Sequence, residues 1–300
     1  MKKPLAVLFV LFLIFTTGCQ TQDAVQVSPT AEIKVNPTAS PTALPSPTVT
    51  ATPAPTLTPT VYLSPTPPQI QVQAGESFIA PILLYHHVAG ENDDNIRYTV
   101  TLEQFQEQMD TLKELGYTSI PLSCLIDVIN NGGSLPQRPV VITFDDGAED
   151  VYQNAYPLMK SMGMSAVMYL VANRLESDGF ITTAQMQEMV NEGGWEVGSH
   201  GMTHVSLPTS SSLSYEMLQS RQLLEKELNL PVQSFAYPFG VADEFIKRKA
   251  KTYGYSAAMG LGKSYEQSKD SLFFLSRIEI QHGTTLEQFI SYLPWQKALE

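Results

Sequence analysis

The chain has 300 residues, 16% of them charged, and a formal net charge of −12 at pH 7. This acidic balance argues against a nucleic-acid-binding protein, which would carry a basic surface, and against adsorption to anionic lipid without a dedicated anchor. With only two cysteines, Cys19 and Cys124, the chain has no framework of several disulfides.

The N-terminus predicts an export signal. Two lysines precede an apolar run over residues 5–15, which is too short to span a bilayer comfortably. The Thr-Thr-Gly-Cys sequence that ends at Cys19 resembles a bacterial lipoprotein signal, although Thr16 stands where that family usually has leucine. The resemblance implies cleavage after residues 1–18 and lipid on Cys19. Ordinary secretion and an uncleaved anchor are the alternatives.

Residues 19–68 predict a disordered linker. Pro-Thr and Pro-Ser repeats from residue 28 onward hold more than half of the 21 prolines. Such a segment buries too little apolar area to offset the entropy of ordering it. Extended proline-rich chain rises about 3 Å per residue, so this linker could reach on the order of 100 Å. It is either a stalk that holds a domain away from a membrane or a passive connection.

Residues 69–300 predict one domain in which strands and helices alternate. Thr101 is an expected helix N-cap, because Gln104 completes a capping box there. Taken in chain order, strands are expected over residues 82–85, 117–120, 140–144, 166–171, 195–198, 235–237, 256–259 and 273–280. Helices are expected over residues 102–115, 122–129, 150–162, 183–191, 212–229 and 242–253, and from residue 285.

This alternation is typical of an α/β fold in which helices cover a parallel sheet. Around seven repeats of strand and helix favour a (β/α) barrel over an open sheet. Barrels of this kind carry their catalytic residues at the carboxyl ends of the strands. Residues with a chemical role should therefore follow strands directly.

Two carboxylates follow the strand expected at residues 140–144, in the sequence Thr-Phe-Asp145-Asp146-Gly. Adjacent carboxylates repel each other, and a bound cation would relieve that repulsion. An ordinary Asp-Asp-Gly turn is the alternative interpretation.

Two histidines, His200 and His204, follow the strand expected at residues 195–198. Spacing of four residues puts both rings on one side of a helical turn, as metal ligands require. Together with Asp146 they would form a site of two histidines and one carboxylate, which leaves a position open for water, as in catalytic zinc sites. A pair of surface histidines is the alternative.

Two further motifs also follow strands. Phe235-Ala-Tyr-Pro-Phe-Gly240 would shape the wall of a groove and could present a backbone N–H, unless it is a plain turn. Tyr85-His86-His87-Val88 ends the first strand, so one histidine could reach the mouth of the barrel while the other is structural.

The motifs Thr-Phe-Asp-Asp-Gly, Ser-His-x-x-x-His and Tyr-Pro-Phe-Gly, in this order, resemble the polysaccharide deacetylases of carbohydrate esterase family 4, the NodB-homology group. The resemblance covers residues 79–292 and implies a distorted (β/α) barrel with about seven strands. Members of the family hydrolyse acetyl groups from chitin, peptidoglycan, poly-N-acetylglucosamine or acetylxylan.

The resemblance also implies roles for individual residues. Asp145 would be the general base, and Asp146, His200 and His204 would bind a divalent metal, usually zinc. The backbone N–H of Phe239 would stabilise the oxyanion. Tyr237 and Pro238 belong to the same loop, which would contact the substrate.

Two positions depart from the family pattern. Ala236 stands where many members carry an arginine that tethers the base, and no histidine stands in the last strand, where many members carry the general acid. The opening Leu-Leu-Tyr-His-His-Val is similar to the subgroup that deacetylates poly-N-acetylglucosamine, in which the acid lies on the first strand. We therefore predict that His86 is the acid and Arg277 the tether, with His282 as the competing acid.

The sequence thus predicts a metal-dependent N-deacetylase of a polysaccharide that contains N-acetylglucosamine. We expect a monomer that is lipid-anchored on the outer face of the cell membrane, or otherwise secreted, and that does not bind nucleic acid. An O-acetyl esterase, a non-catalytic sugar-binding domain and a structural surface protein are the alternatives.

Overall fold

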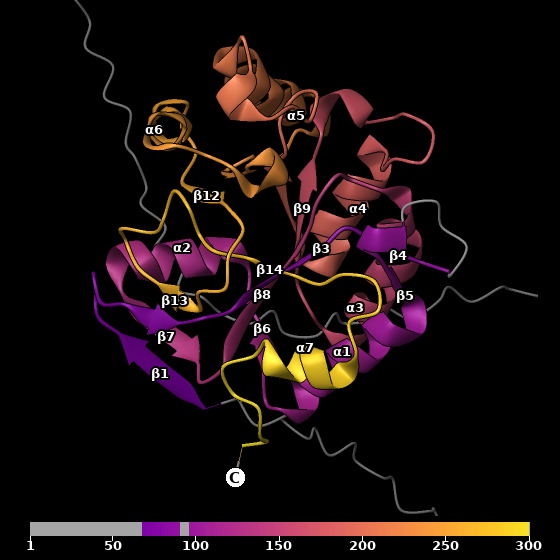
Figure 1. Cartoon of the computed structure of the whole chain (residues 1–300), viewed down its shortest axis with the longest axis vertical. Coiled ribbons are helices and arrows are strands. Elements are labelled where there is room, and N and C mark those ends of the chain that lie inside the picture. The colour runs from indigo at the N-terminus through magenta and orange to yellow at the C-terminus, as the bar shows by residue number, and fades with distance from the viewer. Residues whose placement is uncertain (1–67, 91–95, 300) are drawn as a thin grey trace, which may run out of the picture. The chain divides into compact units, whose positions relative to one another are not determined.

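The computed structural model describes residues 68–90 and 96–299 (Figure 1). The predicted signal, the lipidation site at Cys19 and the proline-rich linker lie outside these residues. None of the helices in the described part of the chain is long and apolar enough to cross a membrane.

A parallel sheet forms the centre of the domain. It has eight strands, seven of which lie in one continuous order. That order is β12 (Ala257–Met259), β11 (Ser234–Ala236), β10 (Glu196–Ser199), β9 (Val167–Leu170), β8 (Pro139–Phe144), β3 (Ile82–Tyr85) and β14 (Ile278–Glu279). The eighth strand, β6 (Thr118–Ser119), pairs with the start of β8. Strands β3, β8 and β9 are buried at every position, which explains their continuous apolar sequences.

The sheet curls, and the segment over residues 272–277 runs between its two edges. Backbone N–H groups of Gly260 and Gly262 in the chain after β12 donate to the carbonyls of Leu275 and Arg277. The same segment then continues into β14, which pairs with β3. The predicted distorted barrel with about seven strands is therefore confirmed.

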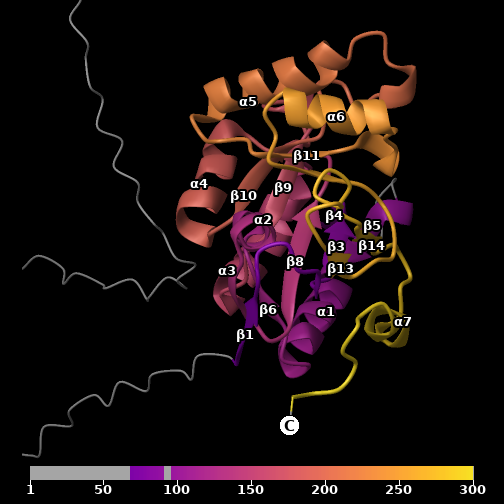
Figure 2. The ribbon, with the colours of Figure 1, turned by 90° about the vertical axis from the view of Figure 1, so that its left-hand side faces the viewer.

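Helices surround the sheet, with α2 on one side of it in Figure 1 and α1, α3 and α4 on the other. Their bounds are α1 (Leu102–Glu114), α2 (Leu122–Asn131), α3 (Tyr156–Met162), α4 (Thr183–Gly193), α5 (Ser220–Leu228), α6 (Glu244–Thr252) and α7 (Leu286–Ser291). Figure 2 shows α5 and α6 together at one end of the domain. The capping box predicted at Thr101 is present, and Thr182 and Thr285 form two more.

Three small strand pairs were not predicted. They are β1 (Gln69–Val72) with β7 (Gly133–Pro136), β2 (Phe78–Ile79) with β13 (Glu266–Gln267), and β4 (His87–Ala89) with β5 (Thr99–Thr101). Strands of two to four residues are too short to show an alternating pattern. The strand expected at residues 273–280 is also shorter than predicted, because only Ile278–Glu279 pairs regularly with β3.

Candidate active site

The register of the sheet brings the predicted site residues to one edge. Tyr85 at the end of β3 lies opposite Phe144 at the end of β8, so His86 and Asp145 follow neighbouring strands at the same level. Ser199, the last residue of β10, likewise lies opposite Phe235 in β11. Residues that are more than 100 positions apart in sequence therefore meet at the carboxyl ends of the strands.

A buried ion pair joins Asp145 to Arg277. The two guanidinium nitrogens Nη1 and Nη2 lie 2.6 and 2.7 Å from the two carboxylate oxygens, and the side chains are 3% and 1% exposed. Burial alone would raise the pKa of Asp145, but the charges of Arg277 and His200 outweigh it and hold that pKa well below its usual range. Asp145 is therefore a fixed carboxylate that can accept further hydrogen bonds.

Further contacts fix the guanidinium of Arg277. Its Nε donates to the Gly260 carbonyl at 3.2 Å, and its Nη1 also lies 3.3 Å from the Thr143 hydroxyl. The guanidinium carbon lies 5.4 Å from the centre of the Tyr169 ring. The structure thus places Arg277, which lies directly before β14, in bidentate contact with Asp145.

Asp146, His200 and His204 form a group with the donor atoms of a metal site. One ligand atom from each residue lies within 4.8 Å of the others, and His204 Nε2 is 3.5 Å from Asp146 Oδ1. His200 Nδ1 lies 2.8 Å from the Ala236 carbonyl oxygen, which only accepts, so Nδ1 donates and Nε2 is the ring nitrogen available to a metal. Burial and the neighbouring His200 lower the pKa of His204 to about 4, so the His204 imidazole is neutral at pH 7. These donors fit a divalent cation with an open position.

Strained backbone is concentrated at this site. Asp146, His204 and Phe239 have φ angles of 71°, 61° and 61°, and they are three of the five non-glycine residues with positive φ in the described part of the chain. A residue with a side chain in this region costs on the order of 1–3 kcal/mol and persists only where the surroundings enforce it. The fold therefore stabilises a backbone geometry here that the sequence would not adopt locally.

The loop after β11 contributes one exposed aromatic side chain. Phe239 is 58% exposed, and its ring centre lies 4.8 Å from that of His204. Tyr237 instead is fully buried, and its hydroxyl donates to the Phe273 carbonyl at 2.9 Å. Pro238 is also buried. In this structure Phe239 can face a substrate, whereas the Tyr237 side chain, expected to contact substrate, supports the loop from the core.

The two histidines at the end of β3 differ in their surroundings. His87 Nδ1 lies 2.6 Å from Asp150 Oδ2, which ties β4 to the turn before α3. His86 packs against Tyr98, and its buried Nδ1 has no hydrogen-bond partner among the described residues. Burial lowers the pKa of His86, while the charges of Asp145 and Asp146 act in the opposite direction. His86 therefore lies within the electrostatic reach of both carboxylates.

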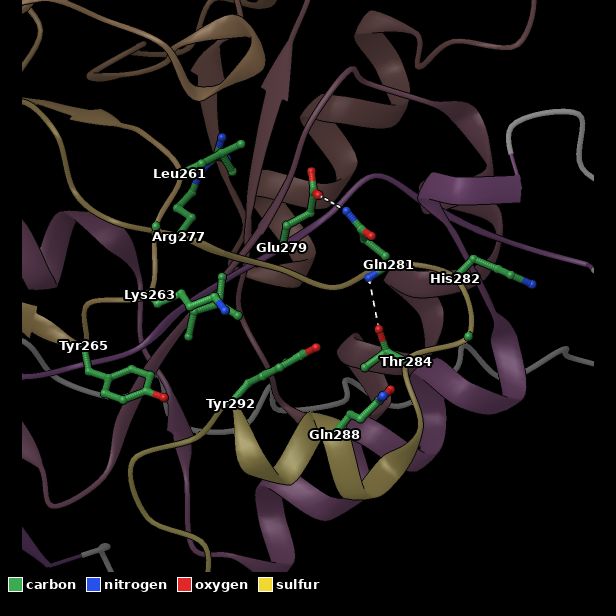
Figure 3. Close-up of a pocket in the computed structure, with 13 residues that line it drawn as sticks. Leu261, Lys263, Tyr265, Arg277, Glu279, Gln281, His282, Thr284, Gln288 and Tyr292 are labelled. Atoms are coloured by element: carbon green, nitrogen blue, oxygen red, sulfur yellow. Dashed lines mark hydrogen bonds between the residues drawn. The ribbon is translucent and has the colours of Figure 1, made fainter.

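His282 lies in the wall of a neighbouring cavity of about 660 Å³ (Figure 3). Arg277 and Glu279 line the same cavity, together with Lys263, Tyr265 and Tyr292. Figure 3 shows the His282 ring directed away from Arg277, and its Nδ1 lies 3.2 Å from the Thr99 carbonyl oxygen. His282 is therefore turned away from the residue that binds Asp145.

The sequence analysis did not identify two residues that contact the site. Arg174 Nη1 lies 3.2 Å from Asp146 Oδ1. Glu216 is buried and accepts hydrogen bonds from the loop between His200 and His204. Neither residue belongs to a local motif, so only the folded chain shows their proximity.

Comparison with known proteins agrees with this geometry. The family model described as polysaccharide deacetylase matches residues 132–258. YxkH of Bacillus subtilis (strain 168), whose name places it among such enzymes, is 26% identical over 219 residues, which are 72% of this chain and 77% of YxkH. A poly-beta-1,6-N-acetyl-D-glucosamine N-deacetylase of Staphylococcus aureus (strain MRSA252) is 27% identical over 178 residues, 53% of this chain and 61% of the relative.

Solved structures show the same fold. A polysaccharide deacetylase from Bacillus cereus has a TM-score of 0.65 and 29% identity, and the match covers 72% of this chain and 69% of that one. IcaB from Ammonifex degensii has a TM-score of 0.60 and 23% identity over 76% of this chain and all of IcaB. Residues 132–258 therefore carry a polysaccharide deacetylase domain of the NodB type. Enzymes of this family generally depend on a divalent metal, for which the Asp-His-His group is the candidate site.

Proposed function

We propose that this protein removes N-acetyl groups from a polysaccharide that contains N-acetylglucosamine, with Asp146, His200 and His204 holding Zn²⁺. The observation that carries the proposal is the buried, ionised Asp145 directly beside this group of ligands, with His200 Nε2 3.5 Å from Asp145 Oδ2. Similarity to the Staphylococcus aureus enzyme named for poly-beta-1,6-N-acetyl-D-glucosamine supports this substrate class.

The side chains have separate tasks in this proposal. A bound divalent cation would polarise the acetyl carbonyl and lower the pKa of a water molecule. Asp145 would accept the proton of the attacking water, because Arg277 keeps it ionised and fixes its direction. The backbone N–H of Phe239, beside His204, would donate to the oxygen that becomes negative. His86 would protonate the leaving nitrogen; burial lowers its pKa, and the charges of Asp145, Asp146 and Glu279 offset part of that effect.

We also propose that residues 69–300 form the catalytic domain, that residues 19–68 act as a spacer, and that residues 1–18 are removed. Lipid on Cys19 would then hold the enzyme on the outer face of the membrane, where the polymer is located. These proposals are supported by the sequence pattern alone. Mass spectrometry of the mature N-terminus tests them, and an unmodified Cys19 in the mature protein would overturn the anchor.

Acetate release by the purified protein tests the proposed activity. Poly-N-acetylglucosamine, peptidoglycan, chitin oligomers and an O-acetylated glycan would be offered to the protein loaded with Zn²⁺. We expect release from an N-acetylated polymer, loss of activity when a chelator removes the metal, and recovery when Zn²⁺ is restored. Faster release from the O-acetylated glycan would instead identify an esterase, and no release from any of them would favour a binding module.

Replacing His86 with alanine should lower kcat by roughly 10²-fold, because the leaving nitrogen would lose its proton donor. The matched His282→Ala variant should retain kcat close to that of the wild type, since the His282 ring is directed away from Arg277. Steady-state acetate release by both variants makes the comparison. Near-normal turnover in His86→Ala combined with a large loss in His282→Ala would reverse the assignment of the acid.

A further inference from the structure

Glu216 is a buried carboxylate that the proposed chemistry does not use. It lies in the π-helical turn Ser214–Gln219 that precedes α5, and only 4% of it is exposed. Its Oε2 accepts the backbone N–H groups of Met202 and Thr203 at 3.0 and 2.9 Å. Its Oε1 accepts the Thr203 hydroxyl at 2.7 Å. All three donors lie in the short loop between His200 and His204.

The carbonyl groups of the same loop are held from the other side. Ala172 N–H donates to the Gly201 carbonyl at 2.9 Å, and Asn173 N–H donates to the Met202 carbonyl at 3.0 Å. The loop between the two histidines is thus bound by its N–H groups to Glu216 and by its C=O groups to the turn after β9. Glu216 accepts the N–H groups of both Met202 and Thr203, so its loss would leave these two groups without their partner.

The contacts that fix this loop also hold His204 in an unfavourable backbone conformation. Its φ angle of 61° is unfavourable for a residue with a side chain, so the surroundings must enforce it. Gly201, with a φ of 88°, lets the chain turn just before the contact, and a Cβ at this position would lie 3.3 Å from Glu216 Oε2. The carboxylate therefore fits closely against the turn that directs His204 towards Asp146.

We propose that Glu216 is a positioning residue for the metal site, which sets metal affinity by holding His204 in the orientation needed to bind. It makes no contact with substrate in this proposal. The inference rests on the proposed role of Asp146, His200 and His204 as metal ligands. Partners that orient metal ligands typically contribute about 10–100-fold in metal affinity.

The test is a titration of the metal-free full-length protein with Zn²⁺ alone, in competition with a chromophoric chelator. Glu216→Ala removes both carboxylate oxygens and with them all three hydrogen bonds, and we expect it to raise the Kd for Zn²⁺ by about 10–100-fold. Glu216→Gln should stay closer to the wild type. Its amide oxygen can still accept both backbone N–H groups while the Thr203 hydroxyl rotates to accept.

Glu196→Ala is the matched control. Glu196 also accepts a backbone N–H, that of Ser123, but it lies at the amino end of β10, away from the ligands. We expect this variant to lower the unfolding midpoint of the metal-free protein and to leave the Kd for Zn²⁺ unchanged. A purely structural role for Glu216 would give the same result, with lower stability and an unchanged Kd, and that result would overturn the inference.

If the alanine variant does not fold, the Kd of Glu216→Asp for Zn²⁺ tests the inference instead. This variant keeps a buried carboxylate, but its side chain is one methylene shorter and cannot reach all three donors. We therefore expect a higher Kd for Zn²⁺ than in the wild type. A wild-type Kd in Glu216→Asp would overturn the inference. A wild-type protein that fails to bind Zn²⁺ at all would overturn the proposed metal site itself. Failure of the metal site is therefore distinguishable from failure of the role inferred for Glu216.

Discussion

Replacing Asp145 with asparagine should lower kcat for acetate release by roughly 10²–10⁴-fold. The amide has nearly the same shape but cannot accept a proton from water, so the loss would be in turnover. Affinity for Zn²⁺ should stay near the wild-type value, because Asp145 is not one of the three grouped ligands. Steady-state kinetics and a metal titration on the same protein would separate the two properties.

Asp127→Asn provides the matched control for this change. Asp127 is an exposed aspartate on α2 that accepts a hydrogen bond from the Asn131 side chain, so its replacement should leave kcat unchanged. Turnover by Asp145→Asn within about tenfold of the wild type would remove Asp145 from the role of base. Loss of Zn²⁺ binding in this variant would instead make Asp145 a part of the metal site.

Replacing Arg277 with methionine should lower the free energy of unfolding of the metal-free protein by about 3–5 kcal/mol. The cause is the carboxylate of Asp145, which is 3% exposed and would lose its two charge-assisted hydrogen bonds. Arg221→Met is the control. Arg221 pairs with Glu225 at 3.0 Å but is 23% exposed, and pairs nearer the surface contribute about 0–1 kcal/mol.

The pH dependence of the Arg277→Met effect has a definite sign. In the wild type the pKa of Asp145 is held below its usual range, so the carboxylate stabilises the fold above about pH 4 and this contribution is lost as the pH falls. Without Arg277, burial raises that pKa, and the variant loses stability as the pH rises. The difference in unfolding free energy between the two proteins should therefore widen from pH 3 to pH 7. A difference that is constant over this range would contradict the assignment.

Local sequence was sufficient for most strands of the central sheet and for the group of Asp146, His200 and His204. Strand β8 is a continuous β-branched run that ends at the two aspartates, so both its position and the place of Asp145 could be predicted from one short segment. The i, i+4 spacing of His200 and His204 is likewise local, but the predicted helical turn is wrong, because both residues lie in a loop with positive φ angles at Gly201 and His204. The approach of Arg277 to Asp145 was inferred from the missing arginine at Ala236, and the structure brings the two side chains together across 132 positions of sequence.

Other features depended on contacts that no local pattern reveals. The hydrogen bonds that Glu216 accepts from Met202 and Thr203 join residues 14 and 13 positions apart, and the surrounding helical pattern does not distinguish this glutamate from its neighbours. The hydroxyl of the buried Tyr237 donates to the Phe273 carbonyl, which lies 36 positions away in the segment between β12 and β14. The short strand pairs form because tertiary packing places their partners side by side, since two or three residues carry little preference of their own.

The contact between Asp145 and Arg277 depends on a part of the chain that is made late in synthesis. Asp145, His200 and His204 are made well before Arg277, which lies directly before β14, the last strand of the sheet. Until that strand pairs with β3, Asp145 has no guanidinium beside it, and a chain that ends before residue 277 would bury an unpaired carboxylate. The bidentate pair between Asp145 and Arg277 therefore requires a chain that is complete through residue 277. A chain shortened before that residue would keep Asp146, His200 and His204 but leave Asp145 without its guanidinium partner.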